Sequence, residues 1–404
     1  MNDGEIAVVK KDSIWVTDRK GNPITKKVFE VNWNAEAAEK GGYEHFMLKE
    51  IHEQPKAVRD TISPRINKEN TQVVLDELKW TKEYVENFNK IYIVACGTAY
   101  HAGLVGKYYI EKLARIPVEI DIASEFRYRD PIIDEHTLTI VISQSGETSD
   151  TLAALKESKR LGAKTLAITN VVGSSIAREA DQVMYTWAGP EIAVASTKAY
   201  TTQLVTMFLF AMYVSGLKGT ITTERTHELL TQLRLLPDEI NRTLEDVEPI
   251  KTFAKNYAFN NDVFYIGRSL DYNVALEGSL KLKEISYIHA EAYAAGELKH
   301  GTLALIESGV PVIALATQKS VYEKTLSNIK EVKARDAVMI GIAAEDDNEL
   351  EKYVDHVIKV PATDELLIPL LTVVPLQLLA YYAAITRGCD VDKPRNLAKS
   401  VTVE

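Results

Sequence analysis

Two sets of three apolar segments, repeated at a constant distance along the chain, constrain the fold more than any other feature. Each segment is four to six residues long, and stretches with helical spacing separate the segments. The offsets between corresponding positions agree, since 263 − 91 and 311 − 139 both equal 172. The first set comprises Ile91–Ala95, Thr137–Ile142 and Thr165–Thr169, and the second comprises Val263–Ile266, Pro311–Leu315 and Ala337–Ile340.

Near-continuous apolar strands that alternate with helices indicate a parallel sheet covered by helices on both faces. The repeat therefore predicts an α/β fold with two tandem doubly wound domains that arose by duplication. We expect the first domain at 76–220 and the second at 245–390. The segments Ala199–Leu217 and Thr223–Leu244 have helical spacing and are predicted to link the two domains.

The residues before the repeat are predicted to form two further parts. Residues 1–33 contain two short strands, Ile6–Val9 and Ser13–Thr17, which cannot bury a core alone and resemble the end of a larger domain. Residues 34–75 change to helical spacing, with a helix that reaches Gln54-Pro55. We interpret this stretch as a linker and helical collar.

Composition excludes several classes of protein. The net charge of −10, from 57 acidic and 47 basic residues, argues against a non-specific nucleic-acid binder. Cys96 and Cys389 are the two cysteines and lie far apart, so neither a disulfide framework nor a cysteine-rich zinc site is expected, and a cytoplasmic location fits. The histidines lack metal-ligand spacing, and no metal or cofactor is expected.

One stretch could be mistaken for a membrane span. Leu366–Ile385 is a run of 20 residues without a charge. Two prolines interrupt this run, and Thr372 and Gln377 are polar, so a buried helix is favoured and no membrane association is expected. A buried helix or an oligomer interface would need the same apolar surface.

The loop after the second strand has the composition of a phosphate site. Ser143–Thr148 contains three hydroxyl groups and one glycine, and a helical stretch follows it. Ligands of open α/β sheets bind at such a strand-to-helix junction, where a helix N-terminus attracts anions. The alternative is a loop whose hydroxyl groups only cap the helix. The equivalent residues of the second set, Thr317–Val321, lack the glycine and the hydroxyl cluster, so we expect them to serve another purpose.

Two further loops could contribute to the same site. Cys96–Gly103 follows the first strand, but its glycines do not match the Gly-x-Gly-x-x-Gly pattern, which disfavours a dehydrogenase. Its Thr98 hydroxyl and backbone amides remain available to a sugar phosphate. Val194–Thr197 begins a helix, and its hydroxyl groups either cap that helix or contact a ligand.

A charged stripe lies on a predicted helix over Asn273–His289. Glu277, Lys281 and Glu284 are spaced i, i+4 and i+7 and fall within an arc of about 60°. One interpretation is a solvent-exposed face with an ion pair. The other is a carboxylate general base with a lysine beside it, as proton transfer next to a carbonyl requires.

Two later segments offer further functional groups. His300 lies between glycines and could open a sugar ring by acid–base transfer, although such a histidine is usually structural or exposed. The tail at 391–404 has no useful periodicity. Its Lys399 is either a solvated charge or an amine that folds over a ligand.

Together these motifs resemble the carboxyl-terminal part of the glucosamine-6-phosphate synthase family. The resemblance extends from Asp3 to the end of the chain. It implies two tandem sugar isomerase (SIS) domains of the flavodoxin-like type and a site for fructose 6-phosphate. The motifs that carry it are Cys96–Thr98, Ser143–Thr148, Glu277 through His300, and Asn396–Glu404.

The resemblance also implies a role for each residue. Lys399 would form an imine with the open-chain sugar, Glu284 would move a proton between C1 and C2, and His300 would help to open the ring. Glu277 and Lys281 would support proton traffic. The residues expected to bind the substrate are Gly97, Thr98, Ser143, Gln144, Ser145, Thr148, Val194, Ser196 and Ala398.

Family members convert fructose 6-phosphate to glucosamine 6-phosphate, or to glucose 6-phosphate without ammonia. They act as homodimers in which the histidine equivalent to His300 comes from the neighbouring chain. Their glutaminase domain begins with a cysteine after the initiator methionine, whereas here Asn2 follows Met1. We therefore expect residues 1–33 to resemble the end of that domain, and the chain not to hydrolyse glutamine. Ala99 replaces a serine that contacts the sugar in some members.

Two functions remain in view, an isomerase and a sugar-phosphate-binding regulator. A regulator needs the phosphate loop but has no use for a base and an imine-forming lysine, so the enzyme is favoured. An amine attacks a carbonyl only when it is neutral. We therefore expect Lys399 to be buried or to lie near another cation, with Lys393, Arg395 and Lys281 as candidates.

Overall fold

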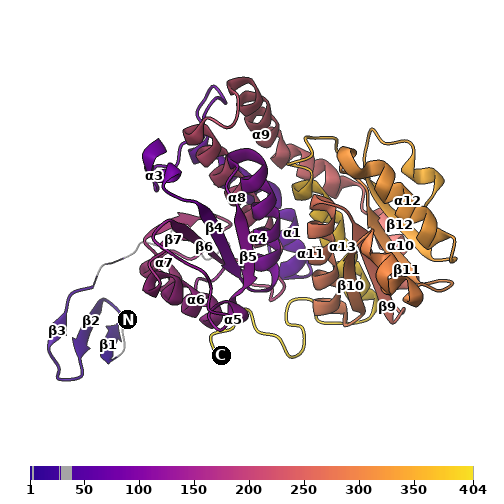
Figure 1. Ribbon diagram of the computed structural model, residues 1–404. Helices are drawn as coiled ribbons and strands as arrows, with labels where there is room; N and C mark the ends of the chain where they lie inside the picture. Colours follow the sequence, from indigo (N-terminus) through magenta and orange to yellow (C-terminus); the bar gives the residue numbers. More distant parts are fainter. Residues whose placement is uncertain (2–3, 27, 29–38, 404) are drawn as a thin grey trace. The chain divides into compact units, whose positions relative to one another are not determined.

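The computed structural model describes residues 1, 4–26, 28 and 39–403. The chain divides into two compact units, Met1–Trp33 and Asn34–Glu404, each of which is described here by itself (Figure 1). Parts of the predicted N-terminal segment, the start of the predicted collar at 34–38, and Glu404 lie outside the described residues.

The first unit is an antiparallel sheet with the order β1-β2-β3. β1 pairs with β2 along its whole length, and these are the two strands that the sequence predicts. Several apolar side chains remain exposed, Val9 and Ile14 by about 70%, because a single small sheet has no second layer to bury them. The strands are β1 (Glu5–Lys10), β2 (Ser13–Asp18) and β3 (Pro23–Ile24).

The second unit contains two parallel five-stranded sheets with the same strand order. The first sheet is ordered β5-β4-β6-β7-β8 and the second β10-β9-β11-β12-β13. Within each, the order is second, first, third, fourth, fifth, the doubly wound arrangement of the flavodoxin type. The prediction of two tandem doubly wound domains is therefore confirmed. The strands are β4 (Lys90–Ala95), β5 (Val118–Ile122), β6 (Thr137–Ser143), β7 (Lys164–Thr169), β8 (Gln182–Tyr185), β9 (Asp262–Gly267), β10 (His289–Ala294), β11 (Pro311–Leu315), β12 (Val338–Ala344) and β13 (His356–Val360).

The six strands predicted from the apolar segments are all present, but sequence reasoning missed four others. The missed strands β5, β8, β10 and β13 are the edges of the two sheets. An edge strand is only partly covered, so it need not be continuously apolar. β5, for example, contains Glu119 and Asp121 and shows no uninterrupted apolar run.

Helices cover both faces of each sheet, and α4, α11 and α13 lie between the two sheets (Figure 1). The collar contains α1 (Phe46–His52) and α2 (Gln54–Ile62), and α3 (Lys82–Glu86) precedes the first strand of the first domain. The first domain contains α4 (Gly97–Tyr109), which a π-helical turn (Ile110–Ala114) extends, α5 (Ala123–Phe126), α6 (Ser149–Arg160) and α7 (Ser175–Glu179). The linking helices are α8 (Lys198–Lys218), α9 (Thr223–Glu245) and α10 (Glu248–Tyr257), and the second domain contains α11 (Leu270–Ser286), α12 (Tyr322–Lys333) and α13 (Pro369–Thr386).

One predicted helix end is close to that in the structure, and another is wrong. The first collar helix, α1, ends at His52, just before Gln54-Pro55, and α2 then begins at Gln54 with Pro55 in its first turn, where a missing N–H costs no hydrogen bond. The charged helix α11 ends at Ser286 rather than His289. Tyr287 adopts the left-handed conformation (φ 62°), which ends the helix, and His289 already belongs to β10.

Two helices, α8 and α13, are long and apolar enough to cross a membrane by length and composition. In both, 83% of the most apolar 18-residue window is buried inside the protein. α13 covers most of Leu366–Ile385, and the expectation of a buried helix for that stretch is confirmed. Pro369 starts the helix, where it is tolerated, and Pro375 lies inside it.

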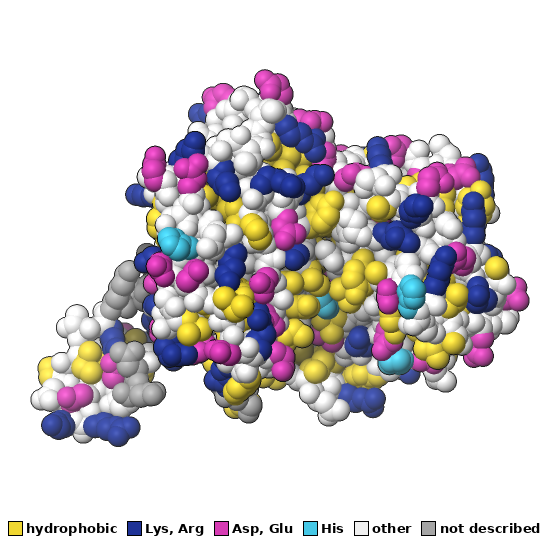
Figure 2. All heavy atoms as spheres, viewed as in Figure 1, with side chains coloured by type: hydrophobic (Ala, Val, Ile, Leu, Met, Phe, Trp, Pro, Cys, Tyr) yellow, Lys and Arg dark blue, Asp and Glu magenta, His cyan; other side chains and the backbone are white. Residues whose placement is uncertain are grey.

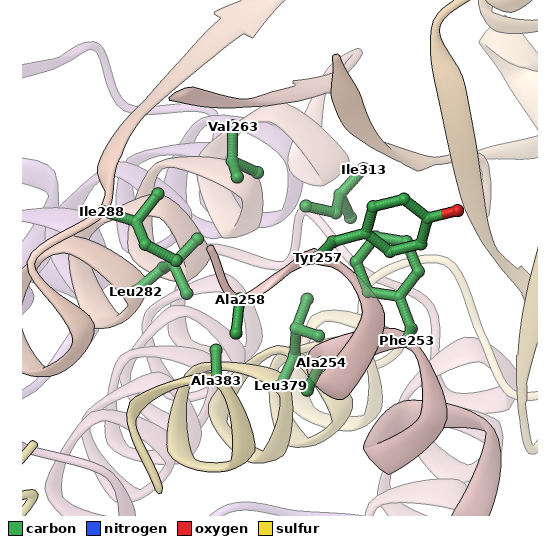
Figure 3. A pocket seen from close by; sticks show the side chains of 10 residues that line it. All are labelled: Phe253, Ala254, Tyr257, Ala258, Val263, Leu282, Ile288, Ile313, Leu379 and Ala383. Atoms are coloured by element: carbon green, nitrogen blue, oxygen red, sulfur yellow. The ribbon is translucent and has the colours of Figure 1, made fainter. Parts of the chain in front are cut away.

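A small apolar pocket lies beside α13 in the second domain (Figure 3). Val263 and Ile313 line it from the sheet, Leu282 from α11, and Leu379 and Ala383 from α13. The lining is hydrocarbon except for Tyr257, and it offers no charged group that could hold a sugar phosphate. The pocket is therefore not a candidate site for that ligand.

Candidate functional site

The loop Ser143–Thr148 joins β6 to α6, as the sequence predicts. Its hydroxyl groups organise the loop, since Ser143 Oγ lies 3.0 Å from Thr148 Oγ1 and accepts the N–H of Gly146 at 3.0 Å. Ser145 Oγ accepts the N–H of Glu147 at 3.1 Å. These hydroxyl groups line one end of a helix whose N-terminal amides can bind an anion.

Gly146 is required at its position for two reasons. Its φ of +67° lies in the left-handed region, which glycine adopts without strain. A Cβ atom there would also lie 2.0 Å from Ser174 Oγ and 2.8 Å from Thr169 Oγ1. The loop therefore folds back on itself tightly enough to turn its hydroxyl groups towards one side.

The C-terminal tail lies against this loop. Ser145 Oγ is 3.0 Å from Ser400 Oγ, and the Ser149 N–H at the start of α6 donates to the Val401 carbonyl at 3.1 Å. Further back, the Val194 N–H donates to the Asp392 carbonyl at 3.0 Å. The tail thus connects the 191–197 loop with the phosphate loop, and Lys399 lies between these two attachments.

Lys399 pairs with a carboxylate that the sequence did not single out. Its Nζ lies 2.5 Å from Glu191 Oε2 and 3.4 Å from Ser196 Oγ, and its side chain is 24% exposed. We expected Lys399 to be buried or to lie near another cation; its side chain is mostly buried, and the group that contacts its amine is a carboxylate. This contact arises because the tail docks beside the 191–197 loop, which presents Glu191.

Glu191 is fully buried and held rigidly. Its Oε1 accepts the backbone N–H groups of Thr197 at 2.9 Å and Ala199 at 3.0 Å, at the start of α8. Burial alone would raise the pKa of Glu191, but the Lys399 ammonium and these hydrogen bonds outweigh it and hold the pKa below its ordinary value. Glu191 is therefore an ionised carboxylate when Lys399 is in contact with it.

The charged stripe on α11 is buried rather than solvent-exposed. Lys281 Nζ lies 2.5 Å from Glu284 Oε2 and 3.4 Å from Glu277 Oε1, and the side chains of Glu277 and Lys281 are at most 1% exposed. Burial alone would lower the pKa of Lys281, but Glu277 and Glu284 outweigh burial and raise it. The interpretation as an exposed ion-paired face is therefore wrong for these two residues.

Residues of α4 in the first domain complete this network. Thr98 Oγ1 donates to Glu277 Oε1 at 3.0 Å and accepts from Lys281 Nζ at 2.9 Å. His101 Nδ1 lies 2.8 Å from Glu277 Oε2. The two domains therefore build one largely buried network of hydrogen bonds and ion pairs, with Glu284 at its less buried end.

Other predicted residues lie around these two centres. Gly97 begins α4 with a φ of +54°, and the Gln144 carbonyl accepts the Asn170 N–H at 3.1 Å. Val194 is half-buried on the 191–197 loop, and Ala398 is exposed on the tail. His300 lies on an exposed 3₁₀ turn, Glu297–His300, and makes no hydrogen bond to another candidate residue in the described part of the chain.

Sequence reasoning missed Glu191 and His101. His101 follows Thr98 by three residues on α4, so helical spacing could have placed both on one face. Glu191 is a single acid in a loop, and no pattern marks it. Its position became visible only because the tail, 208 residues later, brings Lys399 to it.

In the second domain, a carboxylate accepts hydrogen bonds from the loop that is equivalent to Ser143–Thr148. Asp271, at the start of α11, accepts the Thr317 N–H at 2.7 Å, the Thr317 hydroxyl at 2.5 Å and the Gln318 N–H at 3.3 Å. It is 1% exposed, and burial raises its pKa to about 6. An internal carboxylate therefore occupies the donors of this loop.

Among the described residues, no group of three or more His, Cys, Asp or Glu side chains could hold a metal ion. The site consists of hydroxyl groups, carboxylates, lysines and backbone amides. Such a set can bind a phosphate monoester, form an imine through Lys399 and transfer protons through carboxylates.

Comparisons with known proteins identify the family to which the chain belongs. A family model described as the SIS domain matches residues 85–213 and 258–387. The whole chain is 63% identical to glutamine–fructose-6-phosphate aminotransferase [isomerizing] of Caldanaerobacter subterraneus and covers 66% of that protein. It is 53% identical to the protein of the same name from Methanosarcina acetivorans, of which it covers 65%. The chain thus spans slightly less than two thirds of the length of these curated relatives.

Solved structures with similar folds include members of the same family. The chain is similar to the C-terminal domain of glucosamine-fructose-6-phosphate aminotransferase from Francisella tularensis, with 42% identity and a TM-score of 0.83 over 88% of this chain and all of that one. It also shares its fold with a glucosamine-6-phosphate deaminase from Thermotoga maritima, at 24% identity, a TM-score of 0.67, and coverage of 88% of this chain and 99% of that one.

Proposed function

Because the chain belongs to the SIS domain family, we propose that it binds fructose 6-phosphate and is the isomerase part of a glutamine–fructose-6-phosphate aminotransferase. The first domain binds the phosphate. The substrate is a six-carbon ketose phosphate, and its product with ammonia is glucosamine 6-phosphate. Without ammonia the product is glucose 6-phosphate.

One observation supports this proposal above the others: two consecutive tail residues contact the phosphate loop and the 191–197 loop. Ser400 contacts Ser145 of the phosphate loop, while Lys399 contacts Glu191 and Ser196. A sugar whose phosphate lies in the loop would therefore have an amine beside its carbonyl end. A protein that only senses a sugar phosphate has no use for that amine.

Binding in this proposal uses the donors of the loop. Phosphate oxygens accept hydrogen bonds from hydroxyl groups and from backbone amides at the start of α6, which also stabilise negative charge. Ser400 and the Val401 carbonyl contact the same region, so the tail adjusts when phosphate enters. The residues assigned to the phosphate and the sugar are Gly97, Thr98, Ser143, Gln144, Ser145, Thr148, Val194, Ser196 and Ala398.

The covalent step begins when Glu191 accepts a proton from the Lys399 ammonium. The neutral amine attacks C2 of the open-chain ketose, and loss of water gives the imine. In the complete enzyme ammonia replaces the lysine at C2, which restores the Lys399 amine. Glu284 then takes a proton from C1 and returns it to C2, so that C1 becomes the aldehyde of the amino sugar.

The other charged residues support these transfers. Lys281 holds Glu284 at 2.5 Å and balances the charge of Glu277, which keeps the base oriented. His101 and Thr98 hold Glu277 in turn. His300 opens the sugar ring. We assign this role to His300 of the partner subunit in a homodimer, which fits its position on an exposed turn away from the other candidate residues.

The surface and the cysteines agree with a cytoplasmic enzyme that depends on a separate glutaminase domain. On the face shown in Figure 2, basic side chains lie among acidic ones rather than in one large patch, which supports a small-molecule ligand and not nucleic acid.

Burial raises the pKa of Cys96, which makes its thiol a poor nucleophile. Glutamine hydrolysis is therefore assigned to the domain of the complete protein that this chain does not include.

The test is to incubate the purified chain with fructose 6-phosphate and to measure glucose 6-phosphate. We expect product without glutamine, and no glutamate when glutamine is added. Glu284→Gln, which keeps the size of the side chain but removes the base, should lower the rate by about 100-fold or more. Binding of fructose 6-phosphate without turnover by the parent chain would instead favour a sugar-phosphate-binding regulator.

Imine formation gives a second measurement. Borohydride added with fructose 6-phosphate should attach one reduced sugar to Lys399, which peptide mass analysis can locate. Lys399→Arg should lose this adduct because guanidinium stays protonated. An adduct on another lysine would remove Lys399 from the mechanism.

A further inference from the structure

One buried carboxyl group beside the sugar site has no role in the mechanism above. Glu50 lies on the collar helix α1 and is 2% exposed. Its Oε1 accepts the backbone N–H groups of Ile192 at 2.5 Å and Ala193 at 3.3 Å. Its Oε2 is buried and has no hydrogen-bond partner among the described residues. An unpaired oxygen of this kind is costly when it carries charge and much less so when the carboxyl group keeps its proton.

The charged groups that face Glu50 come from three elements. They are Glu191 on the 191–197 loop, Lys399 on the tail and Lys198 at the start of α8. Lys198 is itself paired with Glu53 at 2.6 Å. Burial and then the charge of Glu191 raise the pKa of Glu50 to about 8, so this group keeps its proton at neutral pH.

We propose that Glu50 is a positioning residue for the Lys399 amine, acting through Glu191 and the backbone of residues 192–193. This inference rests on the proposed function. Glu50 fixes the two peptide groups that follow Glu191, and so fixes the carboxylate that Lys399 contacts. The collar is in this way part of the sugar site, although no collar residue was predicted to belong to it.

The proton on Glu50 matters for the charge balance of the amine. Two carboxylates and one ammonium carry a net charge of −1, whereas a protonated Glu50 leaves one carboxylate for one ammonium. A second negative charge beside Lys399 would stabilise the ammonium and oppose loss of its proton. A neutral Glu50 therefore holds the loop without opposing the formation of the nucleophile.

The experiment compares the rate of the borohydride-trapped adduct on Lys399 in the parent, Glu50→Gln and Glu50→Ala. Glutamine keeps an acceptor for the two N–H groups and matches the protonated acid in charge. At pH 7 we expect Glu50→Gln to react within about twofold of the parent, and Glu50→Ala at least 10-fold more slowly. Above pH 8 the parent ionises Glu50, so its rate should rise less steeply with pH than that of Glu50→Gln.

Glu44→Gln is the matched control, since Glu44 is an exposed acid just before α1 and should react as the parent does at every pH. Thermal melting of each variant confirms that it is folded. Equal rates for the parent and Glu50→Ala would overturn the inference, and so would parallel pH profiles for the parent and Glu50→Gln. In both cases the parent still forms its adduct and the proposed function stands. A parent that forms no adduct on Lys399 overturns the proposed function, and the inference with it.

Discussion

The two SIS domains use the loop after their third strand in different ways. In the first, Ser143–Thr148 directs hydroxyl groups and a helix N-terminus to a position that the tail borders. In the second, Asp271 accepts three hydrogen bonds from Thr317 and Gln318 at the equivalent loop. In the first domain, neutral groups of the tail contact the loop and the start of the helix, whereas in the second domain the protein supplies a carboxylate.

The repeat shows which residues of the two domains occupy equivalent positions. Subtracting the offset of 172 pairs Asp271 with Ala99 and Thr317 with Ser145, so the carboxylate of the second domain replaces a methyl group in the first. Both residues lie near the start of the helix after the first strand, α4 and α11. The two domains keep the same fold, and they differ both in this side chain at a helix start and in the loop, since Thr317–Val321 lacks the glycine and the hydroxyl cluster of Ser143–Thr148.

The largest effect is expected when this side chain is moved to the first domain. Ala99→Asp should weaken binding of fructose 6-phosphate by about 100-fold or more, because a carboxylate would compete for the donors and repel the phosphate. Isothermal titration calorimetry measures the affinity. Ala99→Asn has nearly the same size without the charge and should bind more tightly than Ala99→Asp. Equal affinities for the two variants would show that bulk, not charge, closes the site.

The next effect concerns the stability of the second domain. The pKa of Asp271 is raised to about 6, so its ionised form is disfavoured in the folded state. The folded chain binds the Asp271 proton more tightly than the unfolded chain does. The stabilisation that this gives is fully present below about pH 4 and is lost as pH rises through 6, which changes the free energy of unfolding by roughly 3 kcal/mol. Urea unfolding at pH 4, 5, 6 and 7 should show this loss in the parent relative to Asp271→Asn. If the difference between the two chains is independent of pH, Asp271 does not titrate there.

Removing single hydroxyl groups should distinguish the two loops by a smaller change in affinity for the sugar phosphate. Ser145→Ala and Thr148→Val should each weaken sugar-phosphate binding by about 1–3 kcal/mol, since each loses a hydrogen bond to a charged group. Thr317→Val removes the corresponding hydroxyl of the second domain and should leave that affinity unchanged. The opposite ranking in a calorimetric titration would mean that the phosphate binds in the second domain.

The smallest expected effect is an increase in the affinity for fructose 6-phosphate. Ala99→Ser adds one hydroxyl group beside the phosphate loop and should tighten binding by about 0.5–1.5 kcal/mol, the usual contribution of a hydrogen bond. Ala102→Ser, one turn further along α4 at a fully buried position, is the control and should not improve the affinity. If neither variant binds more tightly, position 99 does not face the sugar.

Much of this comparison could be predicted from the sequence. The central strands are buried on both faces, so their apolar runs are unmistakable and the offset of 172 follows from them. The sequence also predicted the hydroxyl-rich loop and showed that the equivalent loop, Thr317–Val321, lacks its glycine and hydroxyl cluster. Both can be recognised because the residues of a loop are contiguous in the sequence. The four edge strands were not predicted, since partial exposure lets polar residues such as Glu119 and Asp121 into them.

Side-chain partners far apart in the sequence were decided by the tertiary structure alone. Lys399 was expected to be buried or to lie near another cation, and its amine pairs with Glu191, while Glu50 reaches the same loop from the collar. Asp271 was not singled out in the sequence, and only the fold brings Thr317 to it. Periodicity records which face of an element is buried but not which element covers it. Partner identity and charge balance therefore depended on packing, whereas strands, helices and the phosphate loop followed from the local pattern.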